Sequence, residues 1–172
     1  MFNFFRRRIA IVAALAAGFT ATCNAAGANM DACQLISAAQ ASRILGTKIT
    51  VHAMDTSAAG PGAGAMCRYG GSGIGGGFML IAGRVHYSNA ATEVARREKE
   101  ALSDTPPGIP MPSFTNIKGL GDAAYLAKTS AYFQLHVLAH DTVIVINRNV
   151  SASAKSVEQV EQLARVALKR LK

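Results

Sequence analysis

The stretch AYFQLHVLAHDTVIVI, residues 131–146, decides the fold of this chain. Its first half alternates polar residues with Phe133, Leu135 and Val137, which is the period of a strand with one buried face. Residues 143–146 form an unbroken apolar run, typical of a strand buried on both faces. Only residues 140–142 separate the two segments, which is enough for a tight turn. The stretch therefore predicts two adjacent antiparallel strands.

Four earlier segments also carry strand signals: residues 48–54, 67–69, 78–87 and 123–127. The strongest is 78–87, where the alternation places Met79, Ile81, Val85 and Tyr87 on one face and Arg84 and His86 on the other. Two segments rich in Gly or Pro, 55–65 and 103–113, are expected to be irregular loops.

Three segments carry helix signals. Ser37 and Gln40 form a capping box, and Gly46 stands where a left-handed residue ends the helix. A second helix is expected to begin at Ser88 or Asn89 and to end near residue 102. The third covers residues 154–172 and has an apolar stripe of Val157, Val160, Ala164, Leu168 and Leu171, with Glu161 and Arg165 spaced for an ion pair.

This order of helices and strands indicates an α+β fold, an antiparallel sheet that about three helices partly cover. A helix followed by strands occurs twice, which hints at two similar halves, although no sequence identity between them indicates a repeat. Removing residues 1–26 leaves 146 residues, a length typical of one domain. We therefore expect residues 27–172 to form a single secreted domain.

The N-terminus has the anatomy of a secretory signal peptide, which we place at residues 1–26. Three arginines at positions 6–8 precede a short apolar run, and small residues follow. The apolar run is too short for a membrane span, which needs about 20 residues. Cys23 could instead carry a lipid anchor, but the residues before it fit such a site poorly. These features predict a periplasmic or secreted protein.

The cysteines support the same location. Cys33 and Cys67 remain after the signal peptide, and an even pair in an oxidising compartment predicts a disulfide. Their spacing is far from that of a Cys-x-x-Cys redox motif, and pairing leaves no thiol nucleophile.

Charge excludes one class of partner. Without the three signal arginines the chain has 15 Lys and Arg against 10 Asp and Glu, a net charge of +5. Three of the cations, Lys169, Arg170 and Lys172, lie at the C-terminus, where a helix dipole favours them. A nucleic-acid binder would show a concentrated basic face with interleaved aromatic residues, so no nucleic-acid partner is expected.

Catalytic and metal-binding patterns are weak. The glycine-rich run 70–77 is followed by a strand pattern and lacks the Lys-Ser/Thr of a phosphate-binding loop, so we interpret it as a hairpin connection. Ser72 lacks the second glycine of a nucleophile elbow. His136 and His140 lie about 13 Å apart along a strand pattern, too far to share one ion. The four histidines are expected on the surface, and the sequence predicts no catalytic residue, no metal site and no cofactor.

Three motifs resemble those of one family. The segment 31–37, DACQLIS, is similar to an Asp-x-Cys-x-Leu-Leu-Thr start, residues 67–69 to a second Cys before an aromatic residue, and 119–125, GLGDAAY, to Gly-x-Gly-Asp-x-Ala-Tyr. Together they resemble a family of small exported proteins and lipoproteins that is abundant in actinobacteria and is classed as a domain of unknown function. The resemblance implies a shared disulfide and fold over nearly the whole mature chain. It implies no activity, substrate or catalytic residue.

Two readings of the 119–125 motif remain open. In one, Gly119 and Gly121 supply positive φ for a turn, Asp122 hydrogen-bonds its own backbone and Tyr125 packs. In the other, these four residues form the rim of a ligand site. Our first hypothesis is an exported, non-enzymatic binding or interaction domain, such as a periplasmic immunity or inhibitor protein, whose partner is an unknown protein or small ligand. The alternative is a small periplasmic hydrolase or ligand carrier with a cleft where His52, His86 or Arg84 approaches Asp122.

Overall fold

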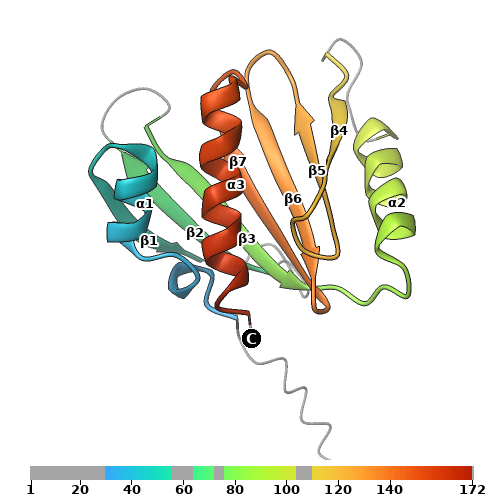
Figure 1. The fold of residues 1–172 in the computed structure, drawn as a ribbon, viewed down its shortest axis with the longest axis horizontal. Coiled ribbons are helices and arrows are strands. Elements are labelled where there is room, and N and C mark those ends of the chain that lie inside the picture. The colour runs from blue at the N-terminus through green and yellow to red at the C-terminus, as the bar shows by residue number, and fades with distance from the viewer. Residues whose placement is uncertain (1–29, 56–63, 72–75, 104–109, 172) are drawn as a thin grey trace, which may run out of the picture.

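One seven-stranded antiparallel sheet forms the centre of the protein, in a computed structural model that describes residues 30–55, 64–71, 76–103 and 110–171 (Figure 1). The signal segment and Cys23 lie outside these residues. The strands are β1 (Ile49–Met54), β2 (Ala65–Gly71), β3 (Phe78–Arg84), β4 (Ser113–Ile117), β5 (Ala123–Lys128), β6 (Phe133–Ala139) and β7 (Thr142–Arg148). The helices are the short 3-10 helix η1 (Ala32–Gln34), α1 (Ala38–Leu45), α2 (Ala90–Ser103) and α3 (Ala154–Leu168). The predicted α+β class is confirmed.

The strand order β1-β2-β3-β7-β6-β5-β4 shows how the sheet is built. Strands β1 to β3 form one meander and β4 to β7 form another. They join where β3 pairs with β7, in a register that runs from Met79 opposite Asn147 to Arg84 opposite Thr142. The two halves expected from the element order are thus two meanders in one sheet.

The stretch at 131–146 folds as predicted. β6 and β7 pair antiparallel through a turn in which His140 and Asp141 have φ values of 49° and 57°. Two consecutive left-handed residues give a turn whose twist matches that of the strands. β7 lies in the middle of the sheet, and Ile144, Val145 and Ile146 are all buried.

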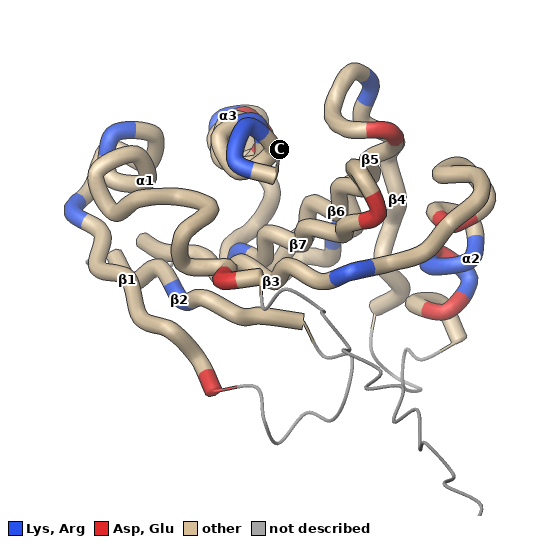
Figure 2. The backbone as a smooth tube through the Cα atoms, turned by 90° about the horizontal axis from the view of Figure 1, so that it is seen from below, with Lys and Arg blue, Asp and Glu red and all other residues tan. Residues whose placement is uncertain are grey.

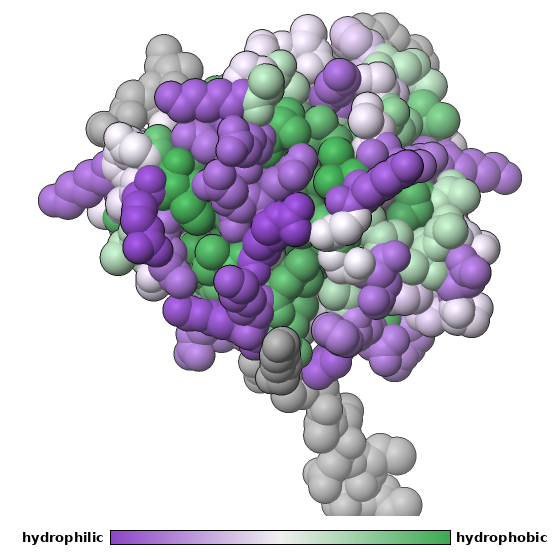
Figure 3. Space-filling model, in the orientation of Figure 1, coloured by the Kyte–Doolittle hydropathy of each residue, from purple (hydrophilic) through white to green (hydrophobic). Residues whose placement is uncertain are grey.

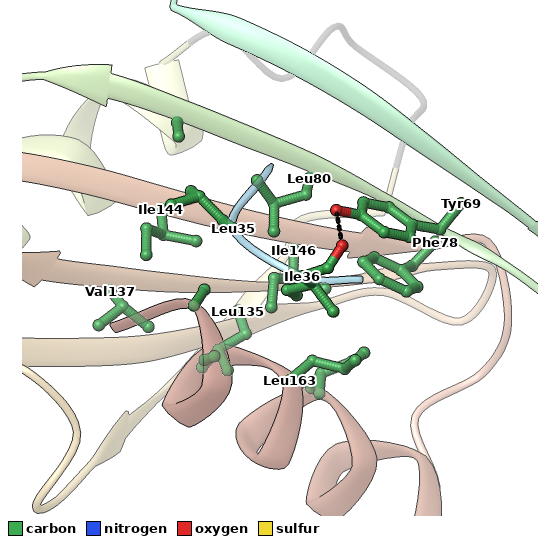
Figure 4. Packing of buried hydrophobic residues seen from close by; sticks show 14 of the residues in the cluster. Leu35, Ile36, Tyr69, Phe78, Leu80, Leu135, Val137, Ile144, Ile146 and Leu163 are labelled. Atoms are coloured by element: carbon green, nitrogen blue, oxygen red, sulfur yellow. Dashed lines mark hydrogen bonds between the residues drawn. The ribbon is translucent and has the colours of Figure 1, made fainter. Parts of the chain in front are cut away.

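η1, α1 and α3 lie over one face of the sheet, which we call the core face (Figures 1 and 2). Here Leu80, Leu135 and Ile146 meet Ile36 and Leu163 in the main hydrophobic core (Figure 4). The capping box of Ser37 and Gln40 and the left-handed Gly46 are present as predicted, and they fix both ends of α1. Seen from this side, hydrophilic side chains cover much of the surface and hydrophobic residues show between them (Figure 3).

Tyr69 and the disulfide attach the N-terminal segment to the sheet. The Tyr69 ring stacks on Phe78 at 4.2 Å, and its hydroxyl donates to the carbonyl of Ile36 at 2.9 Å (Figure 4). Burial raises the pKa of Tyr69 to about 12, so the hydroxyl stays a donor. Two residues earlier, Cys67 is bonded to Cys33, as predicted.

α2 covers part of the opposite face, which we call the second face. It packs against β5, where Val94 meets Tyr125, Ala127 and Leu138 in a smaller cluster. Seen along the sheet, α2 lies beside β4 and β5, at the far end from β1 and β2 (Figure 2). On α2, the buried carboxylate of Glu93 pairs with Arg96 and Arg97 at 2.6 and 2.7 Å.

Four details differ from the sequence-based predictions. β4 begins at Ser113, inside the expected loop, because it pairs with β5 although its own side chains are mostly exposed. β3 ends at Arg84, since its partner β7 starts opposite at Thr142. The buried residues of β3 are Phe78, Leu80 and Ala82, on the face predicted for Arg84. Helix α3 ends at Leu168, before the predicted residue 172, and it buries Leu163 and Ala167 beside Val160 and Ala164. Three residues of the predicted stripe are only partly buried: Val157, Leu168 and Leu171.

The disulfide generates the first prediction. Cys33→Ser and Cys67→Ser should each lower the free energy of unfolding by about 2 to 4 kcal/mol, since the bond closes a long loop. Both changes remove the same bond, so the double variant should cost little more than either single one. Denaturant unfolding without reductant measures these values. Free thiols at both positions in unreduced protein purified from the periplasm would contradict the pairing.

Candidate functional site

A groove of about 370 Å³ crosses the second face beyond the reach of α2. Its walls carry Met54 from β1, Arg68 from β2, Met79 from β3 and Asn147 from β7. Arg68 is opposite Met79 in the sheet, and Met79 is opposite Asn147. One row across three strands therefore places a cation, a thioether and an amide side by side. We call the hollow that these residues line the second-face groove.

Strand alternation explains why these side chains share the second face. Arg68 lies between Cys67 and Tyr69, which are both buried on the core side. Met79 and Asn147 likewise neighbour Leu80 and Ile146, which belong to the main core. Successive residues of a strand point to opposite faces, so the packing of the core fixes the direction of the groove residues.

Glycines form one end of the groove, where β2 turns toward β3. A Cβ on Gly71 would lie 2.0 Å from the carbonyl oxygen of Gly76, and one on Gly77 would lie 2.1 Å from that of Tyr69. The two chain segments therefore approach more closely than any side chain permits. The antiparallel pairing of β2 with β3 agrees with a hairpin connection, and a strand follows the glycines. Ser72 lies outside the described residues.

Arg68 is the cation of the groove. Its side chain is exposed, and it makes no hydrogen bond or ion pair within the described part of the chain. Among the described residues that line the groove there is no Asp or Glu. The guanidinium therefore offers a planar set of donors to an anion from outside.

Asn147 contributes an unsatisfied amide. Its Oδ1 is shielded from water and has no hydrogen-bond partner among the described residues. A buried polar atom without a partner costs free energy, on the order of 1 to 3 kcal/mol. If the side chain turned to bring Oδ1 to the groove, an occupant with an N–H group would remove this cost.

The groove continues toward the edge of the sheet. A second depression is lined by His52, Met54, Arg68 and Gly70, so Arg68 borders both hollows. Met54 is 40% exposed and is one of three exposed large apolar side chains among the described residues. Flexible, polarisable methionines suit a surface that accepts apolar groups of varied shape.

The predicted rim residues occupy the turn before β5. Gly119 and Gly121 have φ values of 69° and 65°, which is the conformation expected of a turn. The Gly119 carbonyl accepts a hydrogen bond from Arg165 of α3 at 3.0 Å. Tyr125 is buried under α2 and lies on the second face, apart from the turn. Among the described residues, Gly119, Gly121 and Asp122 line neither the second-face groove nor a smaller hollow of about 210 Å³, whereas Tyr125 lines that hollow together with Arg97 and His136.

Asp122 holds two other segments in place. Its Oδ2 accepts from the Tyr87 hydroxyl at 2.7 Å and from the His140 backbone N–H at 3.1 Å. These bonds lower the pKa of Asp122, and burial together with this carboxylate raises that of Tyr87 to about 12. The carboxylate binds the backbone of the β6–β7 turn, where the turn interpretation expected a bond to its own backbone. Among the described residues, its carboxylate forms no hydrogen bond or ion pair with His52, His86 or Arg84.

The histidines are dispersed. His52 and His86 are exposed as expected, and no group of three or more metal-ligating side chains occurs in the described residues. The surface prediction is wrong for His136, whose ring stacks on Tyr125 at 4.5 Å on the second face. Burial lowers the pKa of His136 to about 4. Strand β6 alternates as predicted, but the polar residue His136 faces α2 and not the solvent.

A third hollow, of about 570 Å³, lies between η1 and the end of α3. Two of its charged side chains, those of Asp31 and Arg170, form hydrogen bonds within the protein. Asp31 accepts from the Cys33 N–H at 2.9 Å, and Arg170 donates to the Gln34 carbonyl and to Gln40. The Arg84 side chain remains at its border. The second-face groove is therefore the stronger candidate site.

Comparisons with known proteins do not assign this site. No protein-family model and no curated protein matches the chain. One solved structure, described as a GTP binding regulator from Thermotoga maritima, has a TM-score of 0.40 and 10% sequence identity. The match covers 77% of this chain and 88% of that one. A likeness this weak carries no argument.

The turn before β5 gives a prediction with a matched control. Both glycines have positive φ, but only at Gly121 would a Cβ collide, at 2.4 Å from the Leu138 carbonyl oxygen. Gly121→Ala should therefore lower the free energy of unfolding by about 3 kcal/mol or more, and Gly119→Ala by about 1 kcal/mol. Denaturant unfolding of both variants tests this, and equal losses would contradict the packing of the turn.

His136 gives a prediction about acid stability. An unfolded histidine binds a proton near pH 6.5, but folded His136 does so only near pH 4. The unfolded state therefore gains a proton first, and the protein loses stability as the pH falls through this window. His136→Phe keeps a ring on Tyr125 and removes this loss, about 2 kcal/mol between pH 7 and pH 4.5. Free energies of unfolding at both pH values measure it. Parallel pH profiles of the two proteins would refute it.

Proposed function

We propose that this protein is an exported, non-enzymatic binding domain that engages a partner with the second-face groove. The observation that carries the proposal is that, among the described residues, Arg68 and the Oδ1 atom of Asn147 both lack a partner and line one hollow. An occupant that supplies partners for such groups lowers the free energy of the complex. The volume of the groove lies within the range of ligand sites, roughly 300 to 1,000 Å³.

Export is supported by the disulfide between Cys33 and Cys67, because such bonds persist outside the reducing cytosol. The described helices include none that is long and apolar enough to cross a membrane. The signal peptide, the cleavage site and the resemblance to the exported actinobacterial family stay predictions.

The hydrolase or carrier hypothesis receives less support. It requires His52, His86 or Arg84 to converge with Asp122 in a cleft. His52 lies on the edge strand β1, whereas Asp122 precedes β5 near the other edge and is occupied by Tyr87. Arg84 lines the hollow near η1, on the core side. The binding hypothesis needs no such convergence.

Site-specific photocrosslinking in cells that export the protein tests the proposal. Benzoylphenylalanine at Met54, inside the groove, should give a discrete adduct of higher mass. The matched control is Met111, a methionine that is 58% exposed and does not line the groove. Met79→Trp fills the groove without adding charge and should abolish the Met54 adduct. Equal adducts from both positions, or none from Met54, would overturn the proposal.

A further inference from the structure

We infer that the occupant of the second-face groove is an extended peptide segment of a partner protein, held by an internal Asp or Glu side chain on Arg68. This inference rests on the proposed function and names the chemistry of the partner. Three features of the groove carry it: Arg68, the one cation of its described lining, the amide of Asn147, and its length.

The charge of the groove selects an acidic group. Arg68 is unpaired within the described residues, and no carboxylate lines the groove there. A guanidinium binds a carboxylate through two parallel hydrogen bonds, which are stronger than bonds between neutral groups. An occupant without an anion would leave this cation partly desolvated and without a partner.

The amide of Asn147 favours a peptide over other acidic ligands. Its Oδ1 is shielded as the side chain stands, so an occupant can donate an N–H to it only after the side chain turns, and the NH₂ of the same amide requires a carbonyl. A peptide backbone supplies both groups at every residue. The methionine side chains of Met54 and Met79 lie beside Arg68 and can contact apolar side chains that flank the acidic residue.

The length of the groove indicates an extended segment. From His52 on β1 to Asn147 on β7, the sheet is crossed in three strand spacings. At about 4.8 Å each this is roughly 14 Å, the span of about four residues of extended chain. The glycines at positions 70, 71, 76 and 77 have no side chains, so a main chain can approach this end closely.

The position of Arg68 favours an internal acidic residue over a C-terminus. Arg68 borders both the groove and the depression beside His52, so it lies between the two hollows. A terminal carboxylate bound to Arg68 would end the chain there and leave one hollow empty. An acidic side chain allows the segment to fill both.

Peptide binding to the exported full-chain protein tests the inference by fluorescence anisotropy. The probe is a labelled pool of hexapeptides with a central Glu and flanks of Ala, Val, Leu and Met, blocked at both ends. A matched pool has a central Gln, and a third has Gln with a free C-terminal carboxylate. We expect the Glu pool to bind about tenfold more tightly than the blocked Gln pool. Arg68→Gln should remove this preference.

The control is Arg43→Gln, an equal change of charge at an exposed arginine of α1 on the core side, which should keep the preference. Equal binding of the Glu and blocked Gln pools, or an undiminished preference in Arg68→Gln, would overturn the inference. Tighter binding of the free C-terminal pool would also overturn it, in favour of a terminus. If no pool binds although the Met54 adduct forms and Met79→Trp abolishes it, the groove stands as a binding site and only the acidic peptide is refuted.

Discussion

The backbone pairing of β3 with β7 is the contact on which the other features of the structure depend. Six residue pairs join two meanders that would otherwise be separate sheets. The pairing places Leu80 beside Ile146 on the core face, where η1 and α3 cover them. It also places Met79 beside Asn147 on the second face. The hydrophobic core and the groove therefore lie on opposite faces of the same strand pair. If one strand shifted by one residue, its core side chains would point to the groove face and its groove side chains to the core face.

The helices determine which part of the sheet remains accessible. η1 is held over β2 by the disulfide of Cys33 and by the hydroxyl of Tyr69, so the core face is closed at that end. α2 packs on the second face around β5, where Val94 also meets Leu138 of β6. The stack of His136 on Tyr125 lies beneath that helix, whereas Arg68 and Met54 stay exposed at the opposite end. Unequal covering of the two faces thus leaves the groove open, and the glycines of the β2–β3 connection form one end of it.

Local signals in the sequence predicted local structure well. The capping box of Ser37, the tight turn at residues 140–142 and the pairing of the two cysteines are all confirmed. β4 was missed because its short, mostly exposed sequence depends on β5 for its conformation. The groove was missed because Arg68, Met79 and Asn147 come from three separate segments, and only the junction brings them together. A charged residue between Cys67 and Tyr69 was the one available signal, since it had to face away from the core.

Native-state amide hydrogen exchange by NMR tests the central claim that the β3–β7 junction holds the two halves in one cooperative domain. The slowest amides of β3 and β7 should exchange only through global unfolding, with a free energy equal to that from denaturant unfolding. Amides of the edge strands β1 and β4 should open at lower cost. Exchange of the β3 and β7 amides at a free energy well below that of global unfolding, with β5 and β6 still protected, would show that the two meanders separate independently and would contradict the account.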